Sequence, residues 1–409
     1  MRQLLGIRDA RIFLFGWTVS QFGDWALIIV LAVWAKSLTG SNASAGLVFF
    51  ALAAPSIFSP LAGLVVDRVR RRPLLVVVYS IEAVVVLSLL LVHDRDEVWL
   101  LYAMAVFIGT FGTLAASARS ALMTTTIPQE LLGEGNAIFQ SVREGLRLIA
   151  PLIGAGIYAA WGGGVVAVID SVSFVFVVAA LLAMTQTEPR FERVEHNFLS
   201  EALAGARHII DTLPLRQIVF SAGAALFVVG FSETIIFAVI DEGLHRPPSF
   251  LGVLSTLQGI GAIAGGLTAA RGLRVLGDVR VGGLGMAGFA VGELAFVSSS
   301  LPLVAAGIIV AGFGVSWFIV GLMTALQVRT PLRLQGRVSS AADVFISTPQ
   351  TASIAIGAAL IAIVDYRLLV VVESVAVALC AAYLLTRRAI VPAETPPAAS
   401  AELLSQPQP

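Results

Sequence analysis

Two long apolar runs are joined by the stretch Gly63-Leu64-Val65-Val66-Asp67-Arg68-Val69-Arg70-Arg71-Arg72-Pro73. Four arginines and one aspartate fall within six residues of this stretch. Two membrane-spanning helices with so short a link must both end on one side of the bilayer, and arginine-rich links lie on the cytoplasmic side. Gly63 lies one helical turn before Asp67 on the same face, where a neighbouring helix can approach closely. The stretch therefore predicts a pair of transmembrane helices with a cytoplasmic link.

The whole sequence has the composition of a membrane protein rather than that of a soluble domain. Of its 409 residues, 57% are hydrophobic and 13% are charged, and the mean hydropathy is +0.91. A chain of this length has room for about a dozen helices of ~20 residues each. We expect an all-α membrane protein with twelve transmembrane helices. Their approximate ranges are 12–35, 44–66, 74–92, 98–121, 135–160, 164–185, 216–240, 249–270, 280–299, 302–326, 338–364 and 367–386.

The distribution of basic residues predicts the orientation, since the formal net charge is zero. With a cytoplasmic N-terminus, twenty basic residues fall in cytoplasmic segments and four in external segments. Because cytoplasmic loops carry the excess of Lys and Arg, we expect both termini in the cytoplasm. Lys36 is the only lysine, which is typical of a GC-rich bacterial genome. We therefore expect the inner (plasma) membrane of a bacterium.

A polar linker and an internal repeat divide the predicted helices into two halves. We expect an N-terminal six-helix half at 1–185 and a cytoplasmic linker at 186–215 with a short amphipathic helix. A C-terminal six-helix half at 216–388 and a disordered cytoplasmic tail at 389–409 complete the chain. Segment 266–274 repeats the glycine, the leucine and two arginines of 63–71 at the same offsets, with Ala270 in place of Asp67. The repeat predicts two similar halves in parallel orientation.

The pattern Gly-x-x-x-Asp-Arg-x-x-Arg-Arg at 63–72 resembles the signature loop between helices 2 and 3 of the major facilitator superfamily of transporters. It departs from that loop at Arg70, where the family most often has glycine. Within the superfamily, the chain most resembles the branch of bacterial macrolide and siderophore (enterobactin) exporters. The residues that carry this resemblance are Gly23-Asp24-Trp25, Asn136-Ala137, Arg143-Glu144, Ser232-Glu233 and Pro349-Gln350-Thr351.

Segment 150–155 is close to the motif Gly-Pro-x-x-Gly-Gly of antiporters in this family, but alanine replaces glycine at both flanks. A proline kink packed with small residues is an equal alternative. The resemblance also implies a gate at the cytoplasmic ends of the helices, with the loop aspartate facing the start of the eleventh helix. The gating residues that it implies are Gly63, Asp67, Arg68, Arg71, Arg72, Arg337 and Asp343.

Ionisable residues within the predicted spans are candidates for proton coupling, because each is costly in hydrocarbon. Asp24 and Arg147 lie at matched depth, ~20 Å from the cytoplasmic ends of their helices at 1.5 Å per residue. Arg143 shares a face with Arg147, and Glu144 is turned away from both. Glu233 is the leading candidate of the second half. A static ion network that fixes packing, and for Glu233 a position in water at the outer mouth, are the alternatives.

Large side chains on spans that line the central cavity in the family are candidates for contacting substrate. Simple packing and interhelical hydrogen bonds are the alternatives. The candidates are Trp17, Gln21, Phe227, Phe231, Gln258, Trp317 and Phe318. We expect Asp170, Glu293 and Glu373 to be peripheral, where they cap hairpins or pair locally.

The function we expect is proton-coupled export of small amphipathic compounds, such as drug-like molecules or secondary metabolites. A siderophore or lysophospholipid transporter, an uncoupled facilitator and a membrane scaffold are the alternatives. We find no phosphate-binding loop, metal-ligand cluster or ATP-binding domain, so we expect neither an enzyme nor a cofactor. The expected partners are a small-molecule substrate, protons and the lipid bilayer, without nucleic acid, and the expected state is a monomer.

Overall fold

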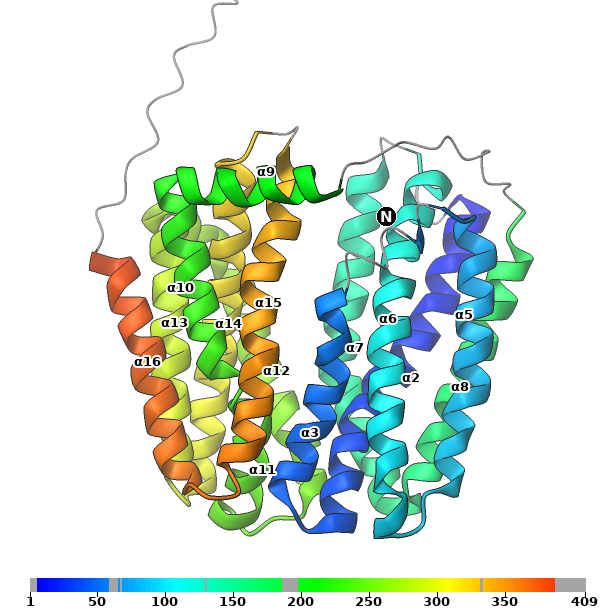
Figure 1. Ribbon diagram of the computed structural model, residues 1–409, viewed down its shortest axis with the longest axis horizontal. Coiled ribbons are helices and arrows are strands. Elements are labelled where there is room, and N and C mark those ends of the chain that lie inside the picture. Colours follow the sequence, from blue (N-terminus) through cyan, green and yellow to red (C-terminus); the bar gives the residue numbers. More distant parts are fainter. Residues whose placement is uncertain are drawn as a thin grey trace, which may run out of the picture.

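A computed structural model describes residues 6–58, 65–66, 68–128, 131–185, 198–331 and 334–386 (Figure 1). Nearly all of these residues are helical, which confirms the expected fold class. The first bundle contains α2 (Arg8–Thr39), α3 (Asn42–Ala53) with η1 (Ala54–Phe58), α5 (Arg71–Val85) with η2 (Val86–Leu91), η3 (Arg95–Glu97) with α6 (Val98–Thr126), α7 (Leu132–Trp161) and α8 (Gly163–Ala183).

The second bundle repeats this arrangement, and α9 (Phe198–Asp211) lies across one end of it (Figure 1). Its helices are α10 (Leu213–Val229), α11 (Ser232–Ala238) with η5 (Val239–Gly243), η6 (Pro248–Phe250) with α12 (Leu251–Leu276), α13 (Asp278–Leu294) with η7 (Ala295–Val297), α14 (Leu301–Val328), α15 (Gln335–Leu360) and α16 (Tyr366–Thr386). The predicted tail at 389–409 lies outside the described residues.

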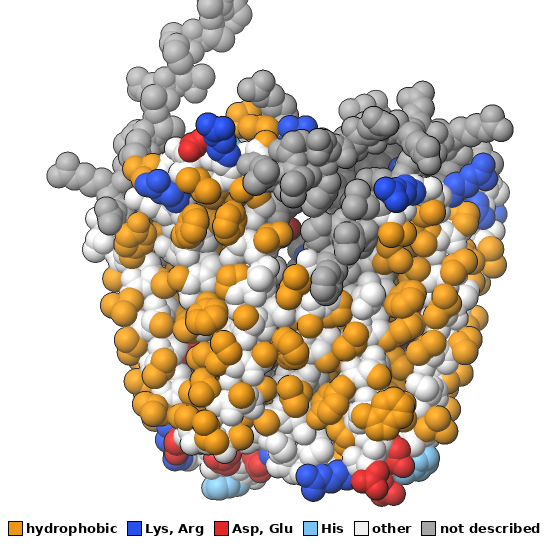
Figure 2. All heavy atoms as spheres, viewed as in Figure 1, with side chains coloured by type: hydrophobic (Ala, Val, Ile, Leu, Met, Phe, Trp, Pro, Cys, Tyr) orange, Lys and Arg blue, Asp and Glu red, His pale blue; other side chains and the backbone are white. Residues whose placement is uncertain are grey.

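The outer surface of the bundles is suited to a bilayer. In the described part of the chain, nine helices are long and apolar enough to cross a membrane, and Asn42–Ile57 and Gly145–Trp161 form shorter apolar helices. The expected twelve spans are consistent with this set. On the face shown in Figure 2, hydrophobic side chains cover the middle and charged side chains gather at the two ends. Such a surface buries its apolar band in lipid and leaves its charges in water.

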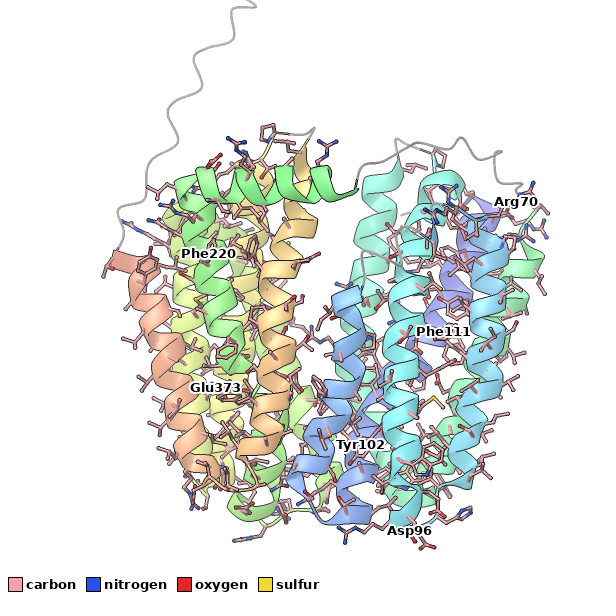
Figure 3. All side chains as sticks on the ribbon, in the orientation of Figure 1. Arg70, Asp96, Tyr102, Phe111, Phe220 and Glu373 are labelled. Carbon is pink, nitrogen blue, oxygen red and sulfur yellow. The ribbon has the colours of Figure 1, made fainter. Side chains whose placement is uncertain are left out.

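The two ends of the molecule differ in their residues. Arg70 and α9 lie at one end, which we call the arginine-rich end, and Asp96 lies at the opposite end (Figures 1 and 3). Toward the arginine-rich end each bundle has its own hydrophobic core: Phe13 and Tyr79 belong to the first core, and Ile209 and Leu384 to the second. Packing on that side therefore holds each bundle together separately.

At the opposite end, the two bundles share one hydrophobic core. It joins Leu31 and Leu101 of the first bundle to Phe237 and Leu254 of the second. Small residues permit this close approach. A Cβ atom at Gly252 of α12, for example, would lie 2.9 Å from the Cβ of Ala155 in α7. The structure is thus a conformation in which the halves are closed against each other at the opposite end.

Polar contacts reinforce this closure at its rim. Lys36 of α2, only 5% exposed, places Nζ 2.6 Å from Oδ2 of Asp241, which is 52% exposed. The same Nζ donates a hydrogen bond to the carbonyl oxygen of Gly40, and Asn42 donates one to Glu242 across the interface. A buried ammonium group needs such partners, because it has lost its hydration.

We expect Asp241→Asn to weaken the closure, because it strands the buried ammonium group of Lys36. The cost should be about 1–3 kcal/mol, between the values typical of exposed and of buried ion pairs. Thiol labelling of Val48→Cys, a buried position of the shared core, should become faster in a Cys380→Ala background. Asp96→Asn, at an exposed aspartate of the same end, is the matched control. Equal labelling rates in the two variants would show that the ion pair does not hold the halves together.

Candidate functional site

A cavity of about 520 Å³ lies between the two halves. The first bundle contributes residues of α2, α3 and α7, and the second contributes residues of α10 to α16. Most of the wall is apolar. Its charged side chains are Arg147, Glu233 and Glu293, and its polar ones are Ser232, Ser255, Gln258, Ser316 and Gln350. The cavity can therefore hold an apolar molecule that also carries a few charged or hydrogen-bonding groups.

Arg147 and Glu233 bring opposite charges to the cavity from the two halves. Arg147, on α7, has its guanidinium carbon 5.8 Å from the centre of the Trp25 ring, in a cation–π arrangement. Its positive charge acts on the carboxyl group of Glu233, which belongs to α11. An ionic or zwitterionic molecule in the cavity would meet both groups.

A break in the seventh predicted span positions Glu233. α10 ends at Val229 and α11 begins at Ser232, so the helix is interrupted at Gly230 and Phe231. Gly230 packs tightly on α15, since a Cβ atom there would lie 2.7 Å from the carbonyl oxygen of Gln350. Only glycine permits this approach without displacement of the neighbouring backbone. A π-helical turn, Val239–Gly243, ends the segment. Irregular helices of this kind are frequent at functional sites.

Asp24 faces the interior of the first bundle rather than the cavity. The positive charge that acts on it belongs to Arg119 of α6, and the adjacent Gly23 packs against Asp170 of α8. Among the described residues, Asp24 and Arg147 form no ion pair. The expectation of matched depth does not fix the direction of a side chain, because successive residues of a helix point about 100° apart. Trp25 therefore meets Arg147, and Asp24 does not.

Four acidic residues are buried in the two bundles away from the hairpins. Glu82 and Asp170 are 4% and 1% exposed, and Glu293 and Glu373 are 3% and 1% exposed. The expectation that Asp170, Glu293 and Glu373 lie at peripheral hairpins is therefore wrong, whereas the expected local pairing is seen for Asp170, which accepts a hydrogen bond from Ser173. The internal repeat of the sequence contains a sign that these acids occupy equivalent positions in the two halves. Asp170 and Glu373 are both the eighth residue of a 21-residue helix, and a serine follows each.

Comparison with known proteins identifies the family. The family model described as Major Facilitator Superfamily matches residues 13–238 and 222–407. The chain belongs to this superfamily. Its members and structural neighbours are transporters, so the protein is a membrane transporter and not an enzyme.

Individual relatives of this superfamily member are distant. An uncharacterised transporter of the same type from Bacillus subtilis (strain 168), YfiS, is 23% identical over 260 residues, or 62% of this chain. The match spans only 61% of the length of that relative. A bacterial homologue of the iron transporter ferroportin, in an inward-facing state, superposes with a TM-score of 0.70 at 16% identity, covering 93% of this chain and 98% of its own. The nucleoside transporter NupG gives 0.71 at 11% identity, covering 91% and 99%.

The expected gating residues of this superfamily transporter are only partly described. Gly63 and Asp67 lie outside the described residues, so the expected latch stays a prediction. Arg68 is exposed, and Arg72 donates a hydrogen bond of 3.0 Å to the carbonyl oxygen of Leu182 in the same bundle. Arg71 begins α5. In the second bundle, the backbone of Arg337 packs against Gly205 of α9, and Asp343 is exposed on α15.

Two of the seven residues expected to contact substrate, Gln258 and Phe318, line the cavity. Trp317 instead donates hydrogen bonds to Gly265 and Thr268 of α12. Trp17 is buried against Phe139.

The other expected contacts also lie off the cavity wall. Phe231 packs against Gly357, and Phe227 is 41% exposed. Gln21 is half-buried away from the lining residues. Arg143 is exposed on α7, and the side chain of Glu144 lies outside the described set.

We expect Arg119→Gln to destabilise the first bundle strongly, because it removes the positive charge that acts on Asp24, whose carboxyl group lies near the buried Glu82 and Asp170. Removing one partner of a buried ion pair typically costs ~3–5 kcal/mol, and the half-buried Arg119 should fall at the lower end. The double variant Asp24→Asn/Arg119→Gln should lose less stability than Arg119→Gln alone. Thermal unfolding of the purified protein in detergent measures both effects, with Arg95→Gln, an exposed arginine, as control. Additive losses in the double variant would contradict the electrostatic account.

Proposed function

We propose that this transporter exports small amphipathic compounds from the cell by alternating access, in exchange for protons. The observation that carries the proposal is the cavity of about 520 Å³ between the halves, mostly apolar and with Arg147 and Glu233 on opposite walls. This volume lies within the range of about 300–1,000 Å³ that is common for small-molecule sites. The resemblance to bacterial macrolide and siderophore (enterobactin) exporters supports the direction of transport and a role in multidrug resistance.

The orientation follows from the basic residues. The arginine-rich end faces the cytoplasm of a bacterial cell, because cytoplasmic loops of inner-membrane proteins carry the excess of Lys and Arg. Both termini then lie inside, and the closed end faces outward. A compound enters the cavity of the monomer from the cytoplasm or from the inner leaflet of the bilayer. Closure of the arginine-rich end then exposes the cavity to the outside.

Closure at the cytoplasmic end uses the gating residues. Asp67 faces the start of α15 near Arg337 when the inner side is closed, and Arg68, Arg71 and Arg72 surround it. Gly63 permits close approach, and Asp343 benefits from the positive N-terminal end of α15. Because Ala270 replaces the aspartate in the second half, the first half contributes most of this latch.

Coupling requires a carboxyl group that binds a proton and a substrate in turn. Glu233 reaches the cavity, and Arg147 opposite it holds the carboxylate when substrate is absent. A cationic compound displaces this interaction, and a proton neutralises the carboxyl group after the compound leaves. Arg143 and Glu144 lie on the same helix as Arg147, and their charges affect the electrostatic potential at its guanidinium group. Asp24 contributes to coupling from inside the first bundle.

An efflux and growth assay tests the proposal, in a bacterial host that lacks its own pumps and with cationic, neutral and anionic amphipathic compounds. Expression should reduce accumulation of at least one class, and collapse of the proton gradient should restore it. Reduced accumulation that survives collapse of the gradient would indicate an uncoupled facilitator. Absence of efflux for every class, with iron–siderophore or lysophospholipid movement instead, would contradict the proposal.

We expect Glu233→Gln to abolish proton-driven efflux of cationic compounds, with at least a tenfold loss of resistance. The reason is that glutamine keeps the shape and hydrogen bonding of the side chain without its charge. Growth inhibition and dye accumulation measure the effect. Glu97→Gln, outside the cavity at the opposite end, is the control. Undiminished efflux of cationic compounds would show that Glu233 neither binds the substrate nor carries the exchanged proton.

A further inference from the structure

Ser232 links two buried carboxyl groups in the wall of the cavity. Its Oγ atom lies 2.5 Å from Oε1 of Glu293 in α13 and 2.5 Å from Oε1 of Glu373 in α16. The two carboxyl groups are also within hydrogen-bonding reach of each other. Figure 3 shows Glu373 inside the second bundle, between its two ends. Three helical segments thus meet at one hydroxyl group.

Counting hydrogen atoms shows that this arrangement contains a bound proton. A serine hydroxyl has one hydrogen to donate, so it can donate to only one of the two carboxyl groups. The other short contact is a hydrogen bond only if that carboxyl group donates its own proton to the serine oxygen. Distances near 2.5 Å are typical of O–H···O⁻ hydrogen bonds. At least one of Glu293 and Glu373 is therefore protonated.

The electrostatic surroundings require the same proton. Glu293 lies on α13 and Glu373 on α16, and helices α10, α11, α12 and α14 belong to the same bundle. Besides the two acids themselves, the charged group that acts on Glu373 is Glu233. The other ionisable groups on these elements and at their ends are Asp211, Arg216, Asp241, Glu242, His245, Arg246, Arg271, Arg274, Asp278, Arg280, Arg329, Asp365, Tyr366, Arg367, Cys380 and Tyr383, and Arg147 of α7 lines the same cavity. Among the described residues none of them forms an ion pair with Glu293 or Glu373. Two carboxylates buried without a cation are very unfavourable.

The first bundle differs in that an arginine lies among its acids and acts on one of them, Asp24. Glu82 and Asp170 occupy the repeat-related helices α5 and α8, and Arg119 of α6 acts on the neighbouring Asp24 and Tyr79. The helix of the second bundle that corresponds to α6 is α14, and Leu322 occupies the position of Arg119, twenty-second in each helix. The second bundle therefore has the acids without this cation.

The pair is placed to exchange its proton with the cavity. Ser232 and Glu293 line the cavity wall, and Glu373 lies behind them. Oε2 of Glu293 is buried and has no hydrogen-bond partner among the described residues, so one acceptor on this wall is unoccupied. Because that atom is buried, the wall beside Glu293 must first open before a water molecule in the cavity can take the proton from the pair.

Helix α11 connects Ser232 and the two acids to the closed end of the molecule. Ser232 is the first residue of α11. Two residues later, Thr234 packs against Gly46 of α3, and Phe237 packs on Phe49 with ring centres 6.3 Å apart. A change in the hydrogen bonds of Ser232 therefore acts on a helix that forms part of the closure between the halves.

We propose that Glu293 and Glu373, bridged by Ser232, form the proton-binding site of the second half, and that its occupancy controls the position of α11. The inference extends the proposed proton exchange by naming the site that carries a proton besides Glu233. With the proton bound, Ser232 holds both acids and α11 keeps its contacts with α3. Loss of the proton to the cavity leaves two carboxylates, of which the hydroxyl can satisfy one, and α11 is released.

Infrared spectroscopy of the full chain in lipid vesicles tests the site without any knowledge of the substrate. The C=O stretching band of a protonated carboxyl group is separate from the bands of carboxylates, and it shifts when H₂O is replaced by D₂O. We expect the spectrum of the wild type minus that of Glu373→Gln, at neutral pH, to contain this band. The spectrum of Glu293→Gln should also lack the band. Ser232→Ala should shift the band, because it removes the shared hydroxyl. Glu242→Gln, an exposed glutamate of the same half, should remove only carboxylate bands.

Three results would overturn the proposal. The first is a difference spectrum for Glu373→Gln that contains only carboxylate bands. The second is a protonated band that Ser232→Ala leaves unshifted. The third is loss of the band on addition of sodium chloride but not of potassium chloride at constant pH, which would identify a bound sodium ion. If Glu373→Gln does not fold, Glu373→Asp keeps the acid but withdraws it from Ser232, so its band should shift. A protein that shows the band and exports none of the tested compounds would contradict the proposed function alone.

Discussion

The hydrophobic core shared by the two halves at one end is the contact on which the rest of the structure depends. It joins α2 and α3 to α11 and α12, and glycines at positions 46 and 252 bring the backbones close enough for it to form. Toward the arginine-rich end, each bundle is held by its own core. The two halves can therefore rotate about the shared core, as about a hinge, without loss of their internal packing. The cavity is the space that this one-sided closure encloses.

The halves share a backbone plan and differ in charge. Both bury an acid at the eighth residue of their last helix and a glutamate on their third. Arg119 acts on the neighbouring Asp24 in the first bundle, and the second bundle has leucine at that position. Because removing charge from water is costly, the second bundle must neutralise its acids with protons. On the proposed proton site, the unequal halves respond differently to pH, although their helices correspond one to one.

Apolar runs and the arginine-rich link were sufficient to predict the helical fold with two halves, because hydrocarbon forces every backbone group to bond within a helix. They could not predict which side chains meet. Asp24 and Arg147 were expected at the same depth, yet they have different neighbours, because an expected depth says nothing about rotation about the helix axis. Glu293 and Glu373 were treated as peripheral, since single residues on outer helices give no sign that they converge. They meet at Ser232, which directly follows the irregular residues Gly230 and Phe231, and hydropathy does not reveal this contact.

That break explains how a small change of charge can move one short helix, α11. An unbroken helix would transmit a displacement at Ser232 to α10 and α11 together, and α10 is packed deeply in the second core. The interruption at Gly230 and Phe231 lets α11 move with less disturbance of α10. Ser232 and Glu233 follow the break directly, so the proton-binding groups and the closure toward α3 lie on the same short segment. Position along the chain, rather than strength of any single contact, makes this segment the place where proton binding and closure can be linked.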